Sequence, residues 1–325
     1  MKRNFLHLVI LIGWILSAFL INTRAQNPPE NSLPPKEIAV TIDDLLLNGP
    51  RIELKRLQVM TGKILSGIKR HQIPVVGFVN ESLLYIPDET DARIALLKSW
   101  SDAGVELGNH TFSHLGFEAA ALAEYEDDFI RGETITKMLM KQKGQKIRYF
   151  RHPFLQMGNT PEIEKSFENF IAARGYRIAP VTIDTMDWMF LAAYSNARRQ
   201  DDAVMMKRVS EEYLKFVALR FDFAEKVAAE LFGRPIKHIL LLHANELNAD
   251  NFDALIKVIK DKGYSFITLE AALKDAVYRF PDKYRPTSDW LSHWVFSKEK
   301  KIAPPPMPPD FIQKAFNEAS GIKTQ

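Results

Sequence analysis

The stretch EIAVTIDD, residues 37–44, decides the fold of this chain. Its first six residues are mainly apolar and rich in β-branched side chains, which predicts a buried strand. Two acidic residues follow directly at the carboxyl end of that strand. Further apolar runs of this kind predict six more strands, at 75–79, 105–108, 146–150, 176–183, 238–242 and 265–267.

Amphipathic stretches lie between these strands and predict helices. The expected helices cover residues 52–71, 90–103, 117–143, 161–174, 201–232, 250–262 and 268–278. Strands that alternate with helices through short connections indicate an α/β fold with a parallel sheet. We expect a barrel of seven or eight β/α units. An open doubly wound sheet is the alternative, but a dinucleotide-binding form of it lacks support because no glycine-rich loop follows the first strand.

Charged or imidazole side chains stand just past the carboxyl ends of five of the seven predicted strands. Active sites of α/β barrels form at this rim, from the loops that follow the strands. The pattern therefore predicts one site that draws on distant parts of the chain. Its candidates are Asp43, Asp44, His110, His114, Arg151, Asp184, Asp187 and His243.

These candidates include the side chains that a metal ion needs. The chain has no cysteine, so a metal must be held by His, Asp or Glu. His110 and His114 stand at i and i+4, which places both imidazoles on one face of a helical turn. An Asp beside them completes a two-His, one-carboxylate site that suits zinc, cobalt, nickel or iron. A capped turn with two solvated histidines is the alternative.

Asp43 and Asp44 are expected to do different work. Adjacent side chains on an extended strand point to opposite faces, so one carboxylate can hold the metal while the other accepts a proton. An Asp pair in a turn or at a helix start is the structural alternative. His243 ends the most apolar strand and is the natural proton donor, unless it is a histidine of the core.

Arg151 and Trp188 are further candidates for the site at this rim. Arg151 stands two residues before Pro153 and can hold a carboxylate through a charge-assisted hydrogen bond. Trp188, which ends the segment Asp184-Thr-Met-Asp-Trp, can wall an apolar pocket or pack in the core.

The ends of the chain are predicted to lie outside the barrel. Residues 1–25 combine a basic start, an apolar run and small residues before a cut after Ala25, which is typical of a signal peptide. A retained membrane anchor is the alternative, and no other segment is apolar enough to span a bilayer. A proline-rich linker (26–36) and a C-terminal extension (279–325) with a second proline-rich segment would flank a domain at 37–278.

The body of the chain is expected to carry little net charge. Lys2, Arg3 and Arg24 lie in the predicted signal and account for the whole formal net charge of +3. A neutral body argues against a nucleic-acid partner, since phosphates attract a basic surface. From the predicted signal peptide we expect an exported protein, periplasmic or secreted, without a stable membrane span after cleavage of the signal.

The motifs and their order are similar to those of a known family. DD (43–44), HTFSH (110–114), RHPF (151–154), DTMDW (184–188) and LLLH (240–243) resemble the motifs of the polysaccharide deacetylases, the NodB-homology or carbohydrate esterase family 4 enzymes. The resemblance implies a distorted (β/α) barrel. It also implies metal-dependent removal of acetyl groups from the nitrogen, and sometimes the oxygen, of sugars.

The same resemblance implies a role for each matching residue. The metal ligands would be Asp44, His110 and His114. The catalytic residues would be a general base, Asp43, oriented by Arg151, and a general acid, His243, tuned by Asp187. Trp188 and Leu241 would line the acetyl pocket, and the backbone N–H near Phe154 would share the charge of the oxyanion.

Two departures from the family pattern bear on the substrate groove and on the proposed acid. Leu45 to Asn48 stand between the acidic pair and Gly49-Pro50, where relatives have Gly-Pro at once, so the groove beside the site is expected to change. Ala244 stands where the family often has Asp after the last histidine, which weakens the expected support of His243.

The sequence leads to an exported, metal-dependent carbohydrate N-deacetylase, with an acetylated carbohydrate as its substrate. An O-acetyl esterase or a small-molecule amidase on the same site is the second hypothesis, because Leu45–Leu47 and residues 189–202 can narrow the groove. A glycan-binding module that has lost turnover is the third hypothesis, because the sequence after His243 is altered.

Overall fold

A computed structural model of the chain describes residues 34–280 and 289–321. The predicted signal peptide, 1–25, and residues 26–33 of the predicted linker lie outside these ranges. None of the helices within the described ranges is long and apolar enough to cross a membrane.

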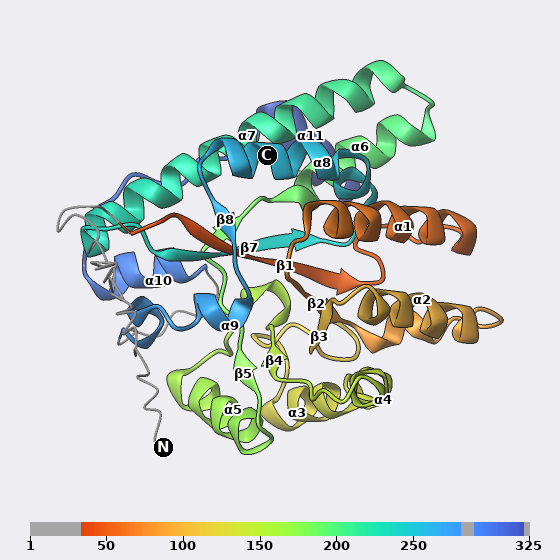
Figure 1. Ribbon diagram of the computed structural model, residues 1–325, viewed down its shortest axis with the longest axis horizontal. Coiled ribbons are helices and arrows are strands. Elements are labelled where there is room, and N and C mark those ends of the chain that lie inside the picture. The colour runs from red at the N-terminus through yellow and green to blue at the C-terminus, as the bar shows by residue number, and fades with distance from the viewer. Residues whose placement is uncertain (1–33, 281–288, 322–325) are drawn as a thin grey trace, which may run out of the picture. The chain divides into compact units, whose positions relative to one another are not determined.

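Eight parallel strands form one sheet (Figure 1). The strands are β1 (Glu37–Leu45), β2 (Val75–Val79), β3 (Glu106–Asn109), β4 (Tyr149–Phe150), β5 (Arg177–Ile178), β6 (Ile183–Asp184), β7 (Lys237–His243) and β8 (Ser265–Phe266). Their order is β5-β4-β3-β2-β1-β7-β6, and β8 pairs with the start of β1. The first strand of the sequence therefore lies inside the sheet, between β2 and β7.

The sheet curls into an incomplete barrel. β5 and β6 stand at opposite ends of the strand order, yet only residues 179–182 join them. Because a residue spans at most about 3.3–3.6 Å, these two outer strands must lie near each other. No ladder among the described residues pairs β5 with β6. The expected distorted barrel is confirmed, whereas the expectation of a single strand over 176–183 is wrong, because that stretch crosses the open seam.

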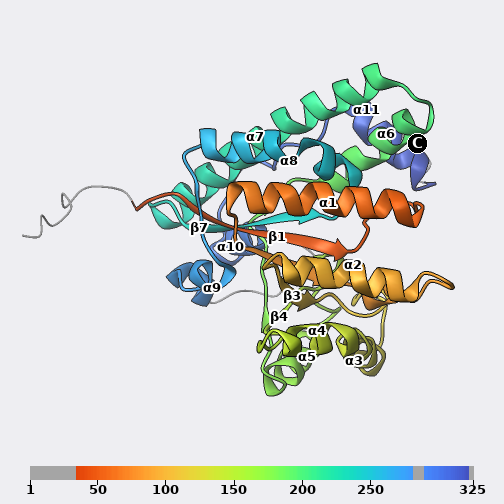
Figure 2. The same cartoon turned by 45° about the vertical axis from the view of Figure 1, so that its right-hand side comes forward.

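Helices cover the outside of the sheet. Figure 1 and Figure 2 show α1, α7 and α8 on one flank of the central strands and α2 to α5 on the other. Their bounds are α1 (Leu54–His71), α2 (Thr90–Asp102), α3 (Leu122–Arg131), α4 (Thr134–Gln142), α5 (Pro161–Ala173), α6 (Asp187–Arg199), α7 (Ala203–Phe232), α8 (Glu246–Asp261), α9 (Leu269–Ala272), α10 (Trp290–Ser297) and α11 (Asp310–Ala319). Three short 3₁₀ helices occur at Glu81–Leu84, Pro153–Leu155 and Ala276–Arg279.

Alternation along β1 separates two parts of the core. Ile38, Val40 and Ile42 pack into the large apolar cluster beneath the helices, whereas Ala39 belongs to a second cluster on the inner side of the curled sheet. Side chains of a strand alternate between faces, so Thr41 and Asp43 continue the inner face. The inner face thus changes from apolar to polar toward the carboxyl end of the strand.

Local signals explain the helix boundaries that position the rim. The Asp202 side chain caps α7 by accepting a hydrogen bond from the Met205 amide, and Gly233 ends α7 in a left-handed conformation. The Asn245 side chain caps α8, directly after β7, by accepting from the Asn248 amide. α8 therefore starts beside His243.

The structure also differs from the sequence-based expectations for some of the helices. Residues 117–143 form α3 and α4 rather than one helix, and 189–202, which carried no helix prediction, lies largely within α6. In the described part of the C-terminal extension, α10 packs on α7 and α11 packs on α6. Residues 301–309 have no regular structure, as their prolines predict.

Candidate active site and metal centre

The two acids at the end of β1 lie in one cluster, contrary to the expectation that they face opposite sides. The register of β1 against β2 shifts between Ile42 and Leu45, and Asp44 has a φ of 58°. This bulge turns the Asp44 side chain away from the face that a regular strand would give it. His110 Nε2 consequently lies 3.8 Å from Asp43 Oδ2 and 3.4 Å from Asp44 Oδ1.

The two histidines come from a loop, not from the predicted helical turn. Residues 110–116 carry no helix, and Thr111 and His114 both have positive φ angles of about 60° (63° and 59°). The loop is fixed by Asp128, which accepts hydrogen bonds from the Ser113 amide and hydroxyl. The left-handed residues bring the imidazoles together, with ring centroids 5.0 Å apart.

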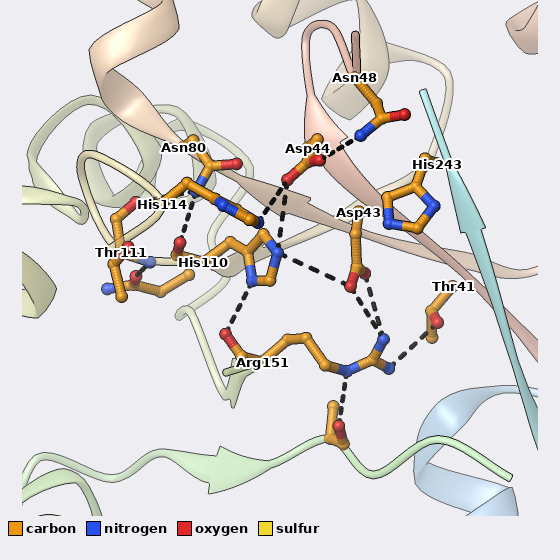
Figure 3. A network of polar contacts seen from close by, with 12 residues as sticks. Thr41, Asp43, Asp44, Asn48, Asn80, His110, Thr111, His114, Arg151 and His243 are labelled. Carbon is orange, nitrogen blue, oxygen red and sulfur yellow. Dashed lines mark hydrogen bonds and ion pairs between the residues drawn. The ribbon is translucent and has the colours of Figure 1, made fainter. Parts of the chain in front are cut away.

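Asp44, His110 and His114 can hold one metal ion (Figure 3). One ligand atom from each lies within 4.8 Å of the others. His110 Nδ1 donates to the Arg151 carbonyl oxygen at 2.8 Å. The lone pair of Nε2, on the side of Asp44, is thereby left to bind a metal ion. His114 Nε2 lies 3.3 Å from Asp44 Oδ1. The set is the predicted one, although the local backbone that assembles it is not.

The Asp44 carboxylate has the properties of a cation ligand. Its Oδ1 is buried and has no hydrogen-bond partner, whereas its Oδ2 accepts from Asn48 Nδ2 at 2.8 Å. Burial alone would raise the pKa of Asp44, but the imidazoles of His110 and His114 hold it well below its usual value. Burial lowers the pKa of His114 to about 4, which favours the neutral imidazole that binds metals. The residues present therefore fit a divalent cation.

Arg151 holds Asp43 from the inner side of the barrel. Its Nη1 lies 3.2 and 3.1 Å from the two oxygens of Asp43, and its Nη2 donates to Thr41 Oγ1 at 3.1 Å. Its Nε donates to the carbonyl oxygen of Ala179 in the seam between β5 and β6. The guanidinium is fully buried and fixes the Asp43 carboxylate next to the histidines.

His243 stands beside this cluster with its own carboxylate. Its Nδ1 donates to Asp187 Oδ1 at 2.6 Å, and its backbone amide donates to Asp187 Oδ2 at 2.8 Å. Asn248 and Asn245 also donate to Asp187 Oδ2. Burial alone would lower the pKa of His243, but the charge of Asp187 raises it to about 10. Although no Asp follows His243, the imidazole has a carboxylate partner in Asp187, which Asn245 and Asn248 hold in place.

A cavity of about 660 Å³ opens beside these groups. The predicted substrate-binding residues Trp188, Phe154 and Leu241 all line it, as do the three candidate ligands and His243. The Phe154 ring packs edge-on against His114, with centroids 4.4 Å apart. Most of the surface that lines the cavity is apolar. The remaining lining residues are Asn48, Gly49, Pro50, Leu155, Asp184, Leu191, Ala192, Phe316, Ala319 and Ser320.

Other residues in or near the sequence motifs lie elsewhere or act differently. Asp184 lines the cavity, but its Oδ1 accepts from the Met186 amide at 2.8 Å and serves the turn before α6. His152 is buried and lies 3.0 Å from the Tyr125 hydroxyl, away from the cavity. Leu45 and Leu46 of the inserted segment are fully buried in the core, so they do not narrow the groove.

Sequence reasoning missed two contributors to the site. Asn48 has only the local signal of following the acidic pair by four residues, and it binds Asp44. The wall formed by Phe316, Ala319 and Ser320 comes from α11 and its C-cap, and no local pattern could place that helix at the rim.

Comparison with known proteins agrees with this geometry. Residues 30–169 match the family model for polysaccharide deacetylase. A peptidoglycan-N-acetylglucosamine deacetylase from Bacillus cereus is 24% identical over 243 residues, which cover 75% of this chain and 70% of that protein. A mutant of a Bacillus anthracis carbohydrate esterase family 4 pseudoenzyme has a similar fold, with 19% identity, a TM-score of 0.50, and coverage of 75% of this chain and 69% of that one. These matches confirm that the chain resembles the polysaccharide deacetylase family.

Proposed function

We propose that this protein is an exported, metal-dependent deacetylase that hydrolyses the acetamide of N-acetyl sugars. The observation that carries the proposal is the meeting of Asp44, His110 and His114 within 4.8 Å, with Asp43 and His243 beside them. The relative from Bacillus cereus, a peptidoglycan-N-acetylglucosamine deacetylase, supports an N-acetylated sugar as the substrate.

The candidate ligands would hold a divalent ion, for which zinc is our first choice and cobalt, nickel or iron the alternatives. Such an ion lowers the pKa of water and acts as a Lewis acid toward a carbonyl oxygen. Asp43, fixed by Arg151, would accept the proton of the attacking water. Asp43 would thus act as the base, while Asp44 would act as a metal ligand.

His243 would give its proton to the leaving amine. Because Asp187 binds Nδ1, the Nε2–H of the imidazolium is the proton that remains for transfer. The raised pKa of His243, about 10, keeps that proton in place at neutral pH. Each member of such an acid–base pair contributes on the order of 10²–10⁴-fold to the rate.

A missing metal ligand, base or acid would favour a non-catalytic glycan-binding protein over an enzyme. The similar pseudoenzyme of carbohydrate esterase family 4 indicates that similarity to this family does not by itself decide turnover. In this chain the three candidate ligands, the base with its arginine and the acid with its aspartate are all present. Their presence favours an active enzyme over a glycan-binding module.

Acetate release from N-acetylglucosamine oligosaccharides tests this function. We expect release by the metal-loaded protein, its loss with chelator and its return when the metal is restored. Asp43→Asn should abolish release while metal stays bound, and Asp261→Asn on the exposed face of α8 should not. Release from no N- or O-acetylated glycan by the loaded protein would refute the proposal. Export predicts cleavage after Ala25, which mass spectrometry of the mature chain checks.

A further inference from the structure

The C-terminal helix α11 is built into the body of the protein. Figure 1 and Figure 2 show it beside α6. Ile312 is fully buried and belongs to the main apolar core. The guanidinium of Arg208 lies over the Phe311 ring, 4.5 Å from its centre. These contacts hold the helix in place, because detaching it would expose the apolar side chain of Ile312 to water at a cost in free energy.

The segment before α11 is tied to the rim of the site. Arg220 of α7 is buried, and its Nε donates to the carbonyl oxygen of Asp184 at 2.9 Å. Its Nη1 donates to the carbonyl oxygen of Pro306 at 3.5 Å. Asp184 ends β6 and lines the cavity. One buried arginine thus joins the proline-rich segment to the strand that borders the site.

α11 supplies one wall of the cavity. Phe316, Ala319 and Ser320 line it, together with Trp188 of α6. The ring of Phe316 meets Trp188 edge-on, with centroids 4.9 Å apart. The candidate metal ligand Asp44 and the proposed acid His243 border the same cavity. A substrate that reaches them must therefore fit beside α11.

We propose that α11 closes the site on its side, so that the enzyme acts on short or chain-terminal N-acetyl sugars and not on the interior of a long glycan. This inference rests on the proposed function. A cavity of about 660 Å³ has the size of a pocket for one small ligand. An interior sugar has neighbours on both sides, and the fixed wall at Phe316 obstructs one of these directions. Trp188 and Phe316 offer apolar faces to a single sugar ring, with few polar groups for further sugars.

The test compares chain lengths in the metal-loaded enzyme. We expect kcat/KM for acetate release from the N-acetylglucosamine hexasaccharide to be no higher than from the disaccharide. Phe316→Ala should raise the hexasaccharide-to-disaccharide ratio on the order of tenfold by opening the wall. Ala319→Trp, at an exposed position, should fill the cavity and lower kcat/KM for both substrates. Lys314→Ala, on the exposed face of the same helix, should change neither.

Binding to the metal-free protein separates this inference from the proposed function. Calorimetry with both oligosaccharides reports length preference without turnover. If the disaccharide binds at least as well as the hexasaccharide and Phe316→Ala reverses the order, the role of α11 stands even when no acetate is released. A wild-type preference for the hexasaccharide, an unchanged ratio in Phe316→Ala, an unchanged kcat/KM in Ala319→Trp, or absence of binding and turnover with both sugars would overturn it.

Discussion

Asp43 and His243 are direct partners across the ladder between the parallel strands β1 and β7. Both are the last inward-facing residues of their strands, so their side chains border the same end of the curled sheet. Each has its own partner of opposite charge, Arg151 for Asp43 and Asp187 for His243. Two neighbouring strands thereby present a base and an acid, and the candidate metal ligands lie beside them.

The Asp187–His243 pair predicts a specific defect in Asp187→Asn. The amide removes the charge that keeps His243 protonated and oriented, so kcat should fall about 10²–10⁴-fold. The stoichiometry of bound metal should not change, because Asp187 is not a candidate ligand. Steady-state kinetics and metal analysis measure the two quantities. An activity within a few-fold of wild type would show that His243 does not need this partner.

The pKa of His243 predicts how the stability of the metal-free protein depends on pH. The folded-state pKa is raised from 6.5 to about 10, so protonation of His243 favours the folded state. This contribution is fully present below pH 6.5 and is lost as the pH rises toward 10. The difference in unfolding midpoint between wild type and His243→Gln should therefore shrink over this interval. A difference that stays constant from pH 6 to pH 10 would contradict the assignment.

Asn48 is predicted to support metal binding through Asp44. Its side-chain amide donates to Asp44 Oδ2 and leaves Oδ1 free to bind a cation. Asn48→Ala should weaken zinc affinity about 10–100-fold, the usual effect of removing a partner of a metal ligand. Competition with a chromogenic chelator measures the affinity, and Asn196→Ala on the exposed side of α6 is the control. Equal affinities in both variants would remove Asn48 from the site.

Gly132 is predicted to be essential for the loop that carries the histidines. A Cβ at Gly132 would lie 2.5 Å from the Thr111 carbonyl carbon and 2.7 Å from the Phe112 nitrogen. Because both atoms are backbone, Gly132→Ala must displace the loop, with a loss of about 1–3 kcal/mol in stability and weaker metal binding. Gly62→Ala, where a Cβ meets nothing within 4 Å, should instead stabilise α1 by up to about 1 kcal/mol. Urea unfolding distinguishes these outcomes, and a Gly132→Ala variant as stable as wild type would refute the packing argument.

The sequence was a good guide to the fold where burial alone decides local structure. The strand at 75–79 and the start of β1 were predicted because most residues of 75–79 and 37–42 are apolar. The outer strands β5 and β6 were predicted as one strand, because two residues in each leave no periodic pattern. Helix α6 follows the rim directly and was missed, since most of its circumference is buried and its apolar pattern has no clear period.

The site was predicted in its members but not in its local geometry. Asp44, His110 and His114 come together as expected, yet through positive φ angles in a loop and a bulge that sequence spacing does not reveal. Their roles in binding and catalysis stay predictions. The wall formed by α11 depends on tertiary contacts with α6, which no local pattern near residue 316 encodes.

The most direct measurement of the central claim is a titration of metal-free protein with zinc, following bound metal and acetate release from N-acetylglucosamine disaccharide together. The three-ligand site predicts that activity rises in proportion to bound zinc and reaches its maximum at one ion per chain, and that Asp44→Asn loses both. Full activity in the metal-free protein, or stoichiometric zinc binding by Asp44→Asn, would contradict it.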